Sequence, residues 1–190
     1  MKHLNRVLPL LCLTAFLLAP SGAFAADPAG IKVALKAADS GNLLARCNAC
    51  VPKGAYPDNA AVHVPVSQLT SATWAQFFLQ KLANGKYALQ SVDSGNYVAR
   101  CNACVPGGAY PDSAFVHVTP AQLPGATWAQ FTLVRLSNGK YALQTDSGNY
   151  LARCNNCIPS GAYPDNAFVH VTQAQLDSSP WAQWEIIVIP

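Results

Sequence analysis

The sequence predicts an all-β domain built from three copies of one four-stranded unit. Short apolar and β-branched runs alternate with turn formers, and no apolar helical stripe follows residue 25. Nearly the same residues also recur with a period of 54, starting at Lys32, Lys86 and Lys140. Three such units closing around a pseudo-threefold axis form a β-trefoil, a short barrel with a triangular hairpin cap. Propellers close with about four to eight blades, so three copies favour the trefoil.

The repeat is strictest from Asp93 to Trp128, where 26 of 36 positions equal their counterparts between Asp146 and Trp181. A fold requires only that apolar and polar residues occur in the right order. The identity of so many residues therefore indicates that a surface is repeated together with the fold.

The first 25 residues have the three regions of a secretory signal peptide: a basic start with Lys2 and Arg6, an apolar run over 7–18 and a small-residue ending. The apolar run is too short for a membrane span. We expect a secreted or periplasmic protein with a single domain over residues 26–190 and repeats at 32–85, 86–139 and 140–190.

The charge balance argues against a nucleic-acid partner. The leader holds two of the twelve Lys and Arg and none of the nine Asp and Glu, so the remaining net charge is about +1. Charged residues are 11% of the chain, against roughly 25% in ordinary globular domains. This composition is typical of an extracellular all-β protein, and we expect no membrane span after the leader.

The elements follow from the same pattern, taken in chain order. A first strand is expected at residues 31–37, and the middle copy shows its four strands most clearly, at 86–91, 97–102, 114–119 and 128–136. Each Asp-Ser-Gly-Asn places a glycine where a tight hairpin needs a positive φ, and Asn-Gly-Lys at Asn84 and Asn138 predicts a hairpin between successive copies. A helical turn is expected only near Gln68 and its equivalents. The last strand, 184–189, should lie beside the first and close the barrel edge.

The stretch NGKYALQSVDSGNYVAR, followed later by WAQF, resembles the repeats of fascin-like trefoils. Those repeats place a Gly-Lys-Tyr-Leu type strand after a turn and a Trp with a nearby apolar residue before it. The resemblance covers all three copies and implies the trefoil fold. Ricin-type lectin trefoils carry Gln-x-Trp at the corresponding strand, whereas this chain has Trp-Ala-Gln-Phe at Trp74 and Trp128 and Trp-Ala-Gln-Trp at Trp181.

Six cysteines after the leader form three Cys-x-x-Cys pairs. Because exported proteins oxidise such thiols, we expect three local disulfides and no metal or other cofactor. Metal binding by two Cys and one His of each copy is the alternative, completed by Asp58, Asp112, Asp165 or water. A redox role is disfavoured, because the thioredoxin motif belongs at a βα junction that is not expected here. The expected disulfides are Cys47–Cys50, Cys101–Cys104 and Cys154–Cys157.

The long loop at 48–59, with its equivalents, concentrates the repeated polar residues. Arg and Asp hydrogen-bond vicinal hydroxyls well, and Tyr can stack on the face of a sugar. In the alternative interpretation, an Arg–Asp salt bridge pins each loop and the Tyr packs beneath it. The candidate ligand-binding residues are Arg46, Asn48, Tyr56, Asp58 and His63 in the first copy, Arg100, Asn102, Tyr110, Asp112 and His117 in the second, and Arg153, Asn155, Tyr163, Asp165 and His170 in the third.

Two further residue types repeat in every copy. The histidines alternate with valine in Val-His-Val, so they face away from the side that the valines bury. We favour half-exposed strand positions for them over positions that line the ligand site. We expect Trp74, Trp128 and Trp181 to lie in the core. Hydrolysis has little support, because Glu185 is the only glutamate and no Gly-x-Ser-x-Gly occurs.

The sequence thus favours a secreted, non-enzymatic β-trefoil that binds a carbohydrate or glycan surface through up to three equivalent sites. A protein-binding or inhibitor trefoil with disulfide-shaped loops is the alternative, and a metal-binding protein is a further one.

Overall fold

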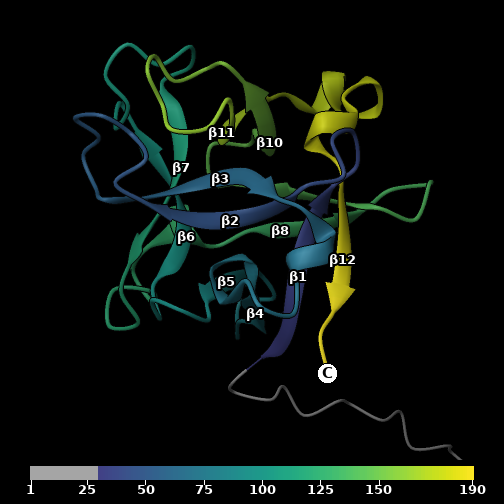
Figure 1. Cartoon of the computed structure of the whole chain (residues 1–190). Helices are drawn as coiled ribbons and strands as arrows, with labels where there is room; N and C mark the ends of the chain where they lie inside the picture. The colour runs from purple at the N-terminus through teal and green to yellow at the C-terminus, as the bar shows by residue number, and fades with distance from the viewer. Residues whose placement is uncertain (1–29) are drawn as a thin grey trace, which may run out of the picture.

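Each copy of the repeat forms four strands in the computed structural model, which describes residues 30–190 (Figure 1). The predicted signal peptide at residues 1–25 lies outside the described residues. All the strands belong to a single twelve-stranded sheet within residues 30–190. The strands are β1 (Ile31–Ala37), β2 (Leu43–Asn48), β3 (Asp58–Val64) and β4 (Phe77–Lys81) in the first copy, β5 (Tyr87–Ser91), β6 (Tyr97–Asn102), β7 (Asp112–Val118) and β8 (Thr132–Arg135) in the second, and β9 (Tyr141–Gln144), β10 (Tyr150–Asn155), β11 (Asp165–Val171) and β12 (Trp184–Val188) in the third.

Six of these strands close into a barrel. β1 pairs with β4 and β12, β4 with β5, and β9 with β8 and β12. A bridge between Tyr87 of β5 and Phe131, the residue before β8, completes the ring. The predicted pairing of the first and last strands is confirmed, because Val33 to Ala37 lie opposite Val188 to Trp184 in antiparallel register (Figure 1). This pairing removes the open edge that the chain ends would leave.

The other six strands form the triangular cap as three hairpins, β2–β3, β6–β7 and β10–β11. The second strand of each hairpin also contacts the other two, since β3 pairs with β7 and β11, and β7 pairs with β11. Glycines make the turns where the sequence predicts them: Gly95 in Asp-Ser-Gly-Asn has φ 72° and Gly85 in Asn-Gly-Lys has φ 82°, values that other residues adopt only with strain.

The helical segments in residues 30–190 are short 3-10 turns. The predicted turn near Gln68 and its equivalent in the third copy are confirmed, but the prediction of a strand beginning at Trp128 is wrong. Trp128 lies in a 3-10 turn, and the strand begins four residues later, at Thr132. The segments are η1 (Val66–Gln68), η2 (Thr73–Ala75), η3 (Thr127–Ala129), η4 (Gln173–Ser178) and η5 (Pro180–Ala182).

The barrel core repeats the same residues from each copy. Phe77, Phe131 and Trp184 occupy equivalent positions and are almost completely buried. Burying a side chain of this size stabilises a fold by about 1.5–3 kcal/mol. The third copy uses Trp where the others use Phe, and its indole Nε1 donates a hydrogen bond to the carbonyl oxygen of Leu151 at 3.0 Å. Within residues 30–190, no helix has both the length and the apolar character needed to cross a membrane.

Candidate functional site

A disulfide between residues three apart closes a tight turn at the start of the loop that joins the two strands of each cap hairpin. The three predicted disulfides are present, with a Cα–Cα distance of 5.7 Å in each. Each loop also leans on its neighbour, because the amide nitrogen of Ala55 donates to the carbonyl oxygen of Cys104 at 3.0 Å. Ala109 donates in the same way to Cys157, and Ala162 to Cys50. The three loops are therefore tied into a ring over the cap.

The metal alternative finds no support in the described part of the chain. Residues 30–190 contain no group of three or more His, Cys, Asp or Glu placed to hold a metal ion.

An arginine in the first strand of each hairpin binds two aspartates, one from its own copy and one from the next. In the first copy, Arg46 Nη1 donates to Asp58 Oδ1 at 2.6 Å, while Nε and Nη2 donate to the two carboxylate oxygens of Asp93 at 2.9 and 2.7 Å. Asn48 adds a second hydrogen bond to Asp58 Oδ1 at 2.7 Å. We call each such group an arginine cluster.

The clusters of the other two copies repeat this geometry in cyclic order. Arg100 binds Asp112 and Asp146, the latter from the third copy. Arg153 binds Asp165 and Asp39, so the ring closes back on the first copy. The hydrogen bond from Arg100 holds the pKa of Asp146 below its usual value, and the hydrogen bonds with the aspartates raise the pKa of all three arginines. The Arg–Asp salt bridge of the alternative interpretation is thus present and extends across copies.

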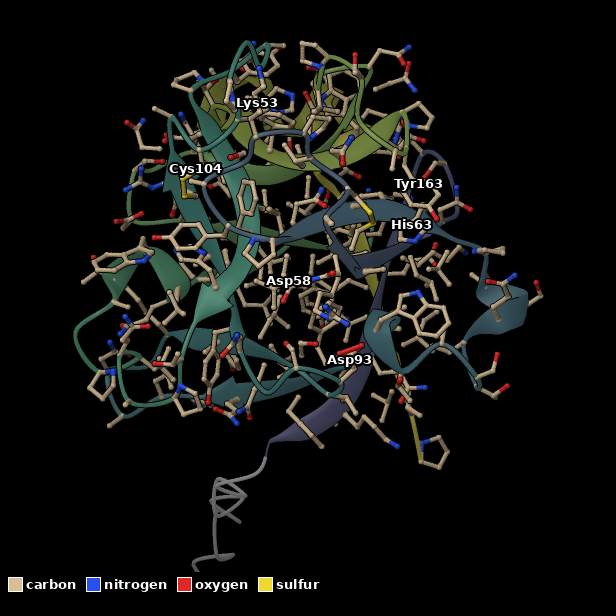
Figure 2. The ribbon with its side chains drawn as sticks, turned by 60° about the vertical axis from the view of Figure 1, so that its left-hand side comes forward. Lys53, Asp58, His63, Asp93, Cys104 and Tyr163 are labelled. Carbon is tan, nitrogen blue, oxygen red and sulfur yellow. A yellow bond between two sulfur atoms is a disulfide. The ribbon has the colours of Figure 1, made fainter. Side chains whose placement is uncertain are left out.

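The loop tyrosine of each copy reaches the histidine of the next copy. Tyr163 stacks on His63 with ring centroids 3.9 Å apart (Figure 2). Tyr56 stacks on His117 at 4.1 Å, and Tyr110 on His170 at 4.2 Å. The tyrosine therefore does not pack beneath the arginine of its own loop. Burial lowers the pKa of the three histidines, so they are neutral at pH 7.

Three shallow pockets lie where the copies meet. The first pocket contains Arg46, the second Arg100 and the third Arg153. Their volumes are about 410, 360 and 320 Å³ in the first, second and third pocket. The shared wall is an Arg, an Asn and a His from the cap hairpin, a Gln and a Trp from the following segment, and the Tyr of the preceding copy. These residues are Arg46, Asn48, His63, Gln68, Trp74 and Tyr163 in the first pocket, Arg100, Asn102, His117, Gln122, Trp128 and Tyr56 in the second, and Arg153, Asn155, His170, Gln175, Trp181 and Tyr110 in the third.

Most of the predicted site residues thus come together, but each pocket combines residues of two copies rather than the residues of one. Tyr56 lies in the pocket of Arg100, although the same loop carries Asp58, which binds Arg46. Asp58 and its equivalents do not line the pockets directly; they contact the arginine and asparagine that do. The histidines line the pockets and are also half-buried strand residues, so both of their expected roles apply.

The prediction that the three repeated tryptophans lie in the core is wrong. Trp74, Trp128 and Trp181 are 37%, 38% and 37% exposed, and each forms part of a pocket wall. The reason is the 3-10 turn, which directs the core position to the aromatic residue three places later, Phe77 in the first copy. A signal for this was present, because every Trp-Ala-Gln is followed by a second large aromatic residue.

Two other pocket groups were not predicted from the sequence. Gln68, with its equivalents in the other copies, follows the second strand of the hairpin and lines the pocket. Asp93 belongs to the Asp-Ser-Gly-Asn turn of the next copy and lines the first pocket while binding Arg46. The turn aspartate recurs in all three copies, although a tight turn requires only its glycine, and this recurrence was the available signal.

Comparison with known proteins supports the fold. Neither the protein-family models nor the curated proteins include a match to this sequence. Among solved structures, a designed threefold-symmetric protein, ThreeFoil, is 23% identical, with a TM-score of 0.60 over 83% of this chain and 99% of its own. A ricin B-like lectin of Macrolepiota procera, solved with lactose, is 10% identical, with a TM-score of 0.56 over 85% and 97%. The SDF2-like protein of Arabidopsis thaliana is 10% identical, with a TM-score of 0.61 over 85% and 96%.

At these identities the similarity shows the fold alone: the protein is a β-trefoil. The narrower resemblance to fascin-like repeats stays a prediction.

Proposed function

We propose that the protein is a secreted, non-enzymatic carbohydrate-binding protein with three equivalent sites, one in each pocket. The observation that carries the proposal is the exposed tryptophan repeated in all three pockets. A core position would bury an indole completely, whereas each of these three keeps more than a third of its surface in water, where the flat face of an indole can pack against the C–H face of a sugar ring.

The remaining pocket groups suit a small polyhydroxylated ligand. Asn48 and Gln68 supply amide donors and acceptors beside Trp74. A volume of about 320–410 Å³ lies at the small end of the range for ligand sites, as a mono- or disaccharide requires. The ricin B-like lectin solved with lactose has the same fold, which makes the trefoil a suitable scaffold for sugar binding.

Export is part of the proposal. Disulfides persist in oxidising compartments, and the three present here agree with the signal-peptide pattern of the first 25 residues. We propose no cofactor and no nucleic-acid partner.

The test is a glycan array followed by calorimetry on the oxidised protein, with Trp74→Ala, Trp128→Ala and Trp181→Ala combined in one variant. We expect retention on at least one glycan family with a stoichiometry near three, and loss of that binding in the triple variant. Because nearly two thirds of each indole is buried, the triple variant should lose some stability, so circular dichroism is needed to show that it is folded under the binding conditions. The matched control is Trp184→Ala, which empties the core and costs about 3–5 kcal/mol of stability.

A wild-type protein that retains on no glycan, while it captures a protein partner through the same loops, would favour the protein-binding or inhibitor function instead.

A further inference from the structure

Among residues 30–190, the acidic residues are concentrated around the three pocket arginines. Within residues 30–190, six of the seven aspartates belong to the arginine clusters. Outside the clusters, the described acidic side chains are Asp177 and Glu185, and Glu185 is neutralised by Lys36 at 2.9 Å. Six lysines and Arg135 make the rest of the described surface positive. The pockets are therefore local negative regions on a positively charged body.

Each arginine cluster carries a net charge of −1, because one guanidinium is paired with two carboxylates. Three of the five N–H groups of each guanidinium are already donated to these aspartates, and the excess negative charge of the cluster disfavours an anionic ligand at the remaining two. Arg46 commits Nε and Nη2 to Asp93 and Nη1 to Asp58, and Arg100 and Arg153 are committed in the same way. No lysine of residues 30–190 lines any of the three pockets.

The aromatic wall of each pocket also favours a cationic ligand. In the first pocket, Trp74 and Tyr163 are 37% and 38% exposed and lie on the wall that also holds Arg46 and Asp93. The face of an indole or phenol ring attracts cations, by about 0.5–2 kcal/mol. Exposed aromatic rings line all three pockets, and the arginine in the wall of each pocket carries two aspartates, although an aspartate lines the pocket itself only in the first, as Asp93.

We propose that these sites select amino sugars that carry a free ammonium group, and that they discriminate against acidic sugars. This inference rests on the proposed carbohydrate-binding function and adds the chemical class of the ligand. An ammonium group gains from both the negative cluster and the aromatic faces, whereas N-acetylation removes its charge and a uronic acid carboxylate is repelled by the two aspartates.

The experiment compares three oligosaccharides of equal length by calorimetry at pH 6.5: an oligomer of glucosamine, one of N-acetylglucosamine and one of glucuronic acid. We expect the glucosamine oligomer to bind about tenfold more tightly than the N-acetylated one, and the glucuronic acid oligomer to bind least. The preference for the amine should weaken at high salt, because salt screens the attraction between the ammonium group and the solvent-exposed carboxylates.

A variant pair separates the clusters from the overall charge. Combining Asp39→Asn, Asp93→Asn and Asp146→Asn removes the excess negative charge of the three pockets and should abolish the preference between the amine and its N-acetylated form. The matched control, Asp177→Asn, changes an acidic residue outside the pockets and should leave that preference intact. Circular dichroism establishes that both variants are folded; if the triple variant does not fold, the wild-type comparison decides by itself.

Equal or tighter binding of the N-acetylated oligomer would overturn this inference and leave the proposed function standing. Absence of binding to every oligosaccharide, on the array and in calorimetry, would overturn both.

Discussion

The histidine of each pocket couples packing between copies to its own protonation. His63 lies in β3 of the first copy but stacks on Tyr163 from the third. Its Nδ1 is buried and has no hydrogen-bond partner among the described residues, and the same holds for His117 and His170. Protonation of His63 would bury an N–H without an acceptor. For His117 and His170 the backbone of Phe115 and Phe168 partly opposes the effect of burial, but burial is the larger cause and the pKa of all three is lowered.

The pH dependence of stability should follow from these three residues. Burial lowers the histidine pKa in the folded state below the unfolded value of about 6.5. Below about pH 6.5 the unfolded chain therefore binds more protons than the folded protein. The stability that is present above this pH is lost as the pH falls. We expect the melting temperature to fall between pH 7 and pH 5.

The control combines His63→Phe, His117→Phe and His170→Phe, which keeps an aromatic stack but removes the titration. Carboxylates such as Asp146, whose pKa is lowered, affect stability only at more acidic pH, below about 4. An unchanged pH slope in the Phe variant would contradict the role given to the histidines.

At the residue scale, the sequence predicted which residues repeat better than it predicted where they lie. The strand and turn positions followed from local chemistry, such as the glycine of Asp-Ser-Gly-Asn. The position of Trp74 depends on a 3-10 turn, which is too short to leave a periodic pattern, and only the aromatic residue at Phe77 marked the true core position. The recurrence of Asp93 in every copy was visible in the sequence, but its pairing with Arg46 of the preceding copy was not predictable, because it depends on how the copies close around the axis.

At the element scale, each disulfide loop serves two neighbouring pockets. Cys101 and Cys104 line the second pocket. The hairpin loop that begins at this disulfide also carries Tyr110, which lines the third. The sequence of one copy does not reveal this, because the neighbouring loop sets the direction of each long loop. The hydrogen bond from the Ala109 amide nitrogen to the Cys157 carbonyl oxygen is one example.

Replacing one cysteine pair should therefore impair two sites and preserve one. For Cys101→Ser with Cys104→Ser, we expect the binding stoichiometry to fall from three towards one, with the first pocket retained. Because the closed loop is short, chain entropy limits the loss of folding stability to about 2 kcal/mol. Calorimetry and denaturant unfolding measure the two quantities.

The matched variant, Cys47→Ser with Cys50→Ser, should instead preserve the third pocket, since Cys47 and Cys50 line the first and Tyr56 of that loop lines the second. If both pairs of substitutions leave the stoichiometry at three, the loops do not shape the sites.

At the scale of the whole molecule, three sites on one rigid body act together on a surface that displays many ligands. A single shallow site should bind a free sugar weakly, because much of the ligand stays in water. Three sites of this kind can raise the avidity by about 10² to 10⁴. The cyclic arrangement also makes it possible to remove one site by a substitution in a different copy.

Tyr56→Ala should remove the second pocket and leave the first, although Tyr56 belongs to the first copy. We expect the stoichiometry for free sugar to fall from three to two, and retention on a glycan-coated surface to fall far more than by one third. The indole N–H signals in an NMR titration identify the site, since that of Trp128 should stop responding to ligand while those of Trp74 and Trp181 still shift. Loss of the Trp74 response instead would show that each copy builds its own pocket.

The cyclic sharing of residues also bears on how the gene can change. Each copy lends its turn aspartate to the preceding copy and its loop tyrosine to the following one, so a substitution in one third of the chain is felt at pockets centred on the others. Copies that were functionally independent would be free to diverge, and one could decay without harm to its neighbours. Here each pocket takes residues from more than one segment, so a single segment on its own would build a complete pocket only as a ring of three identical chains.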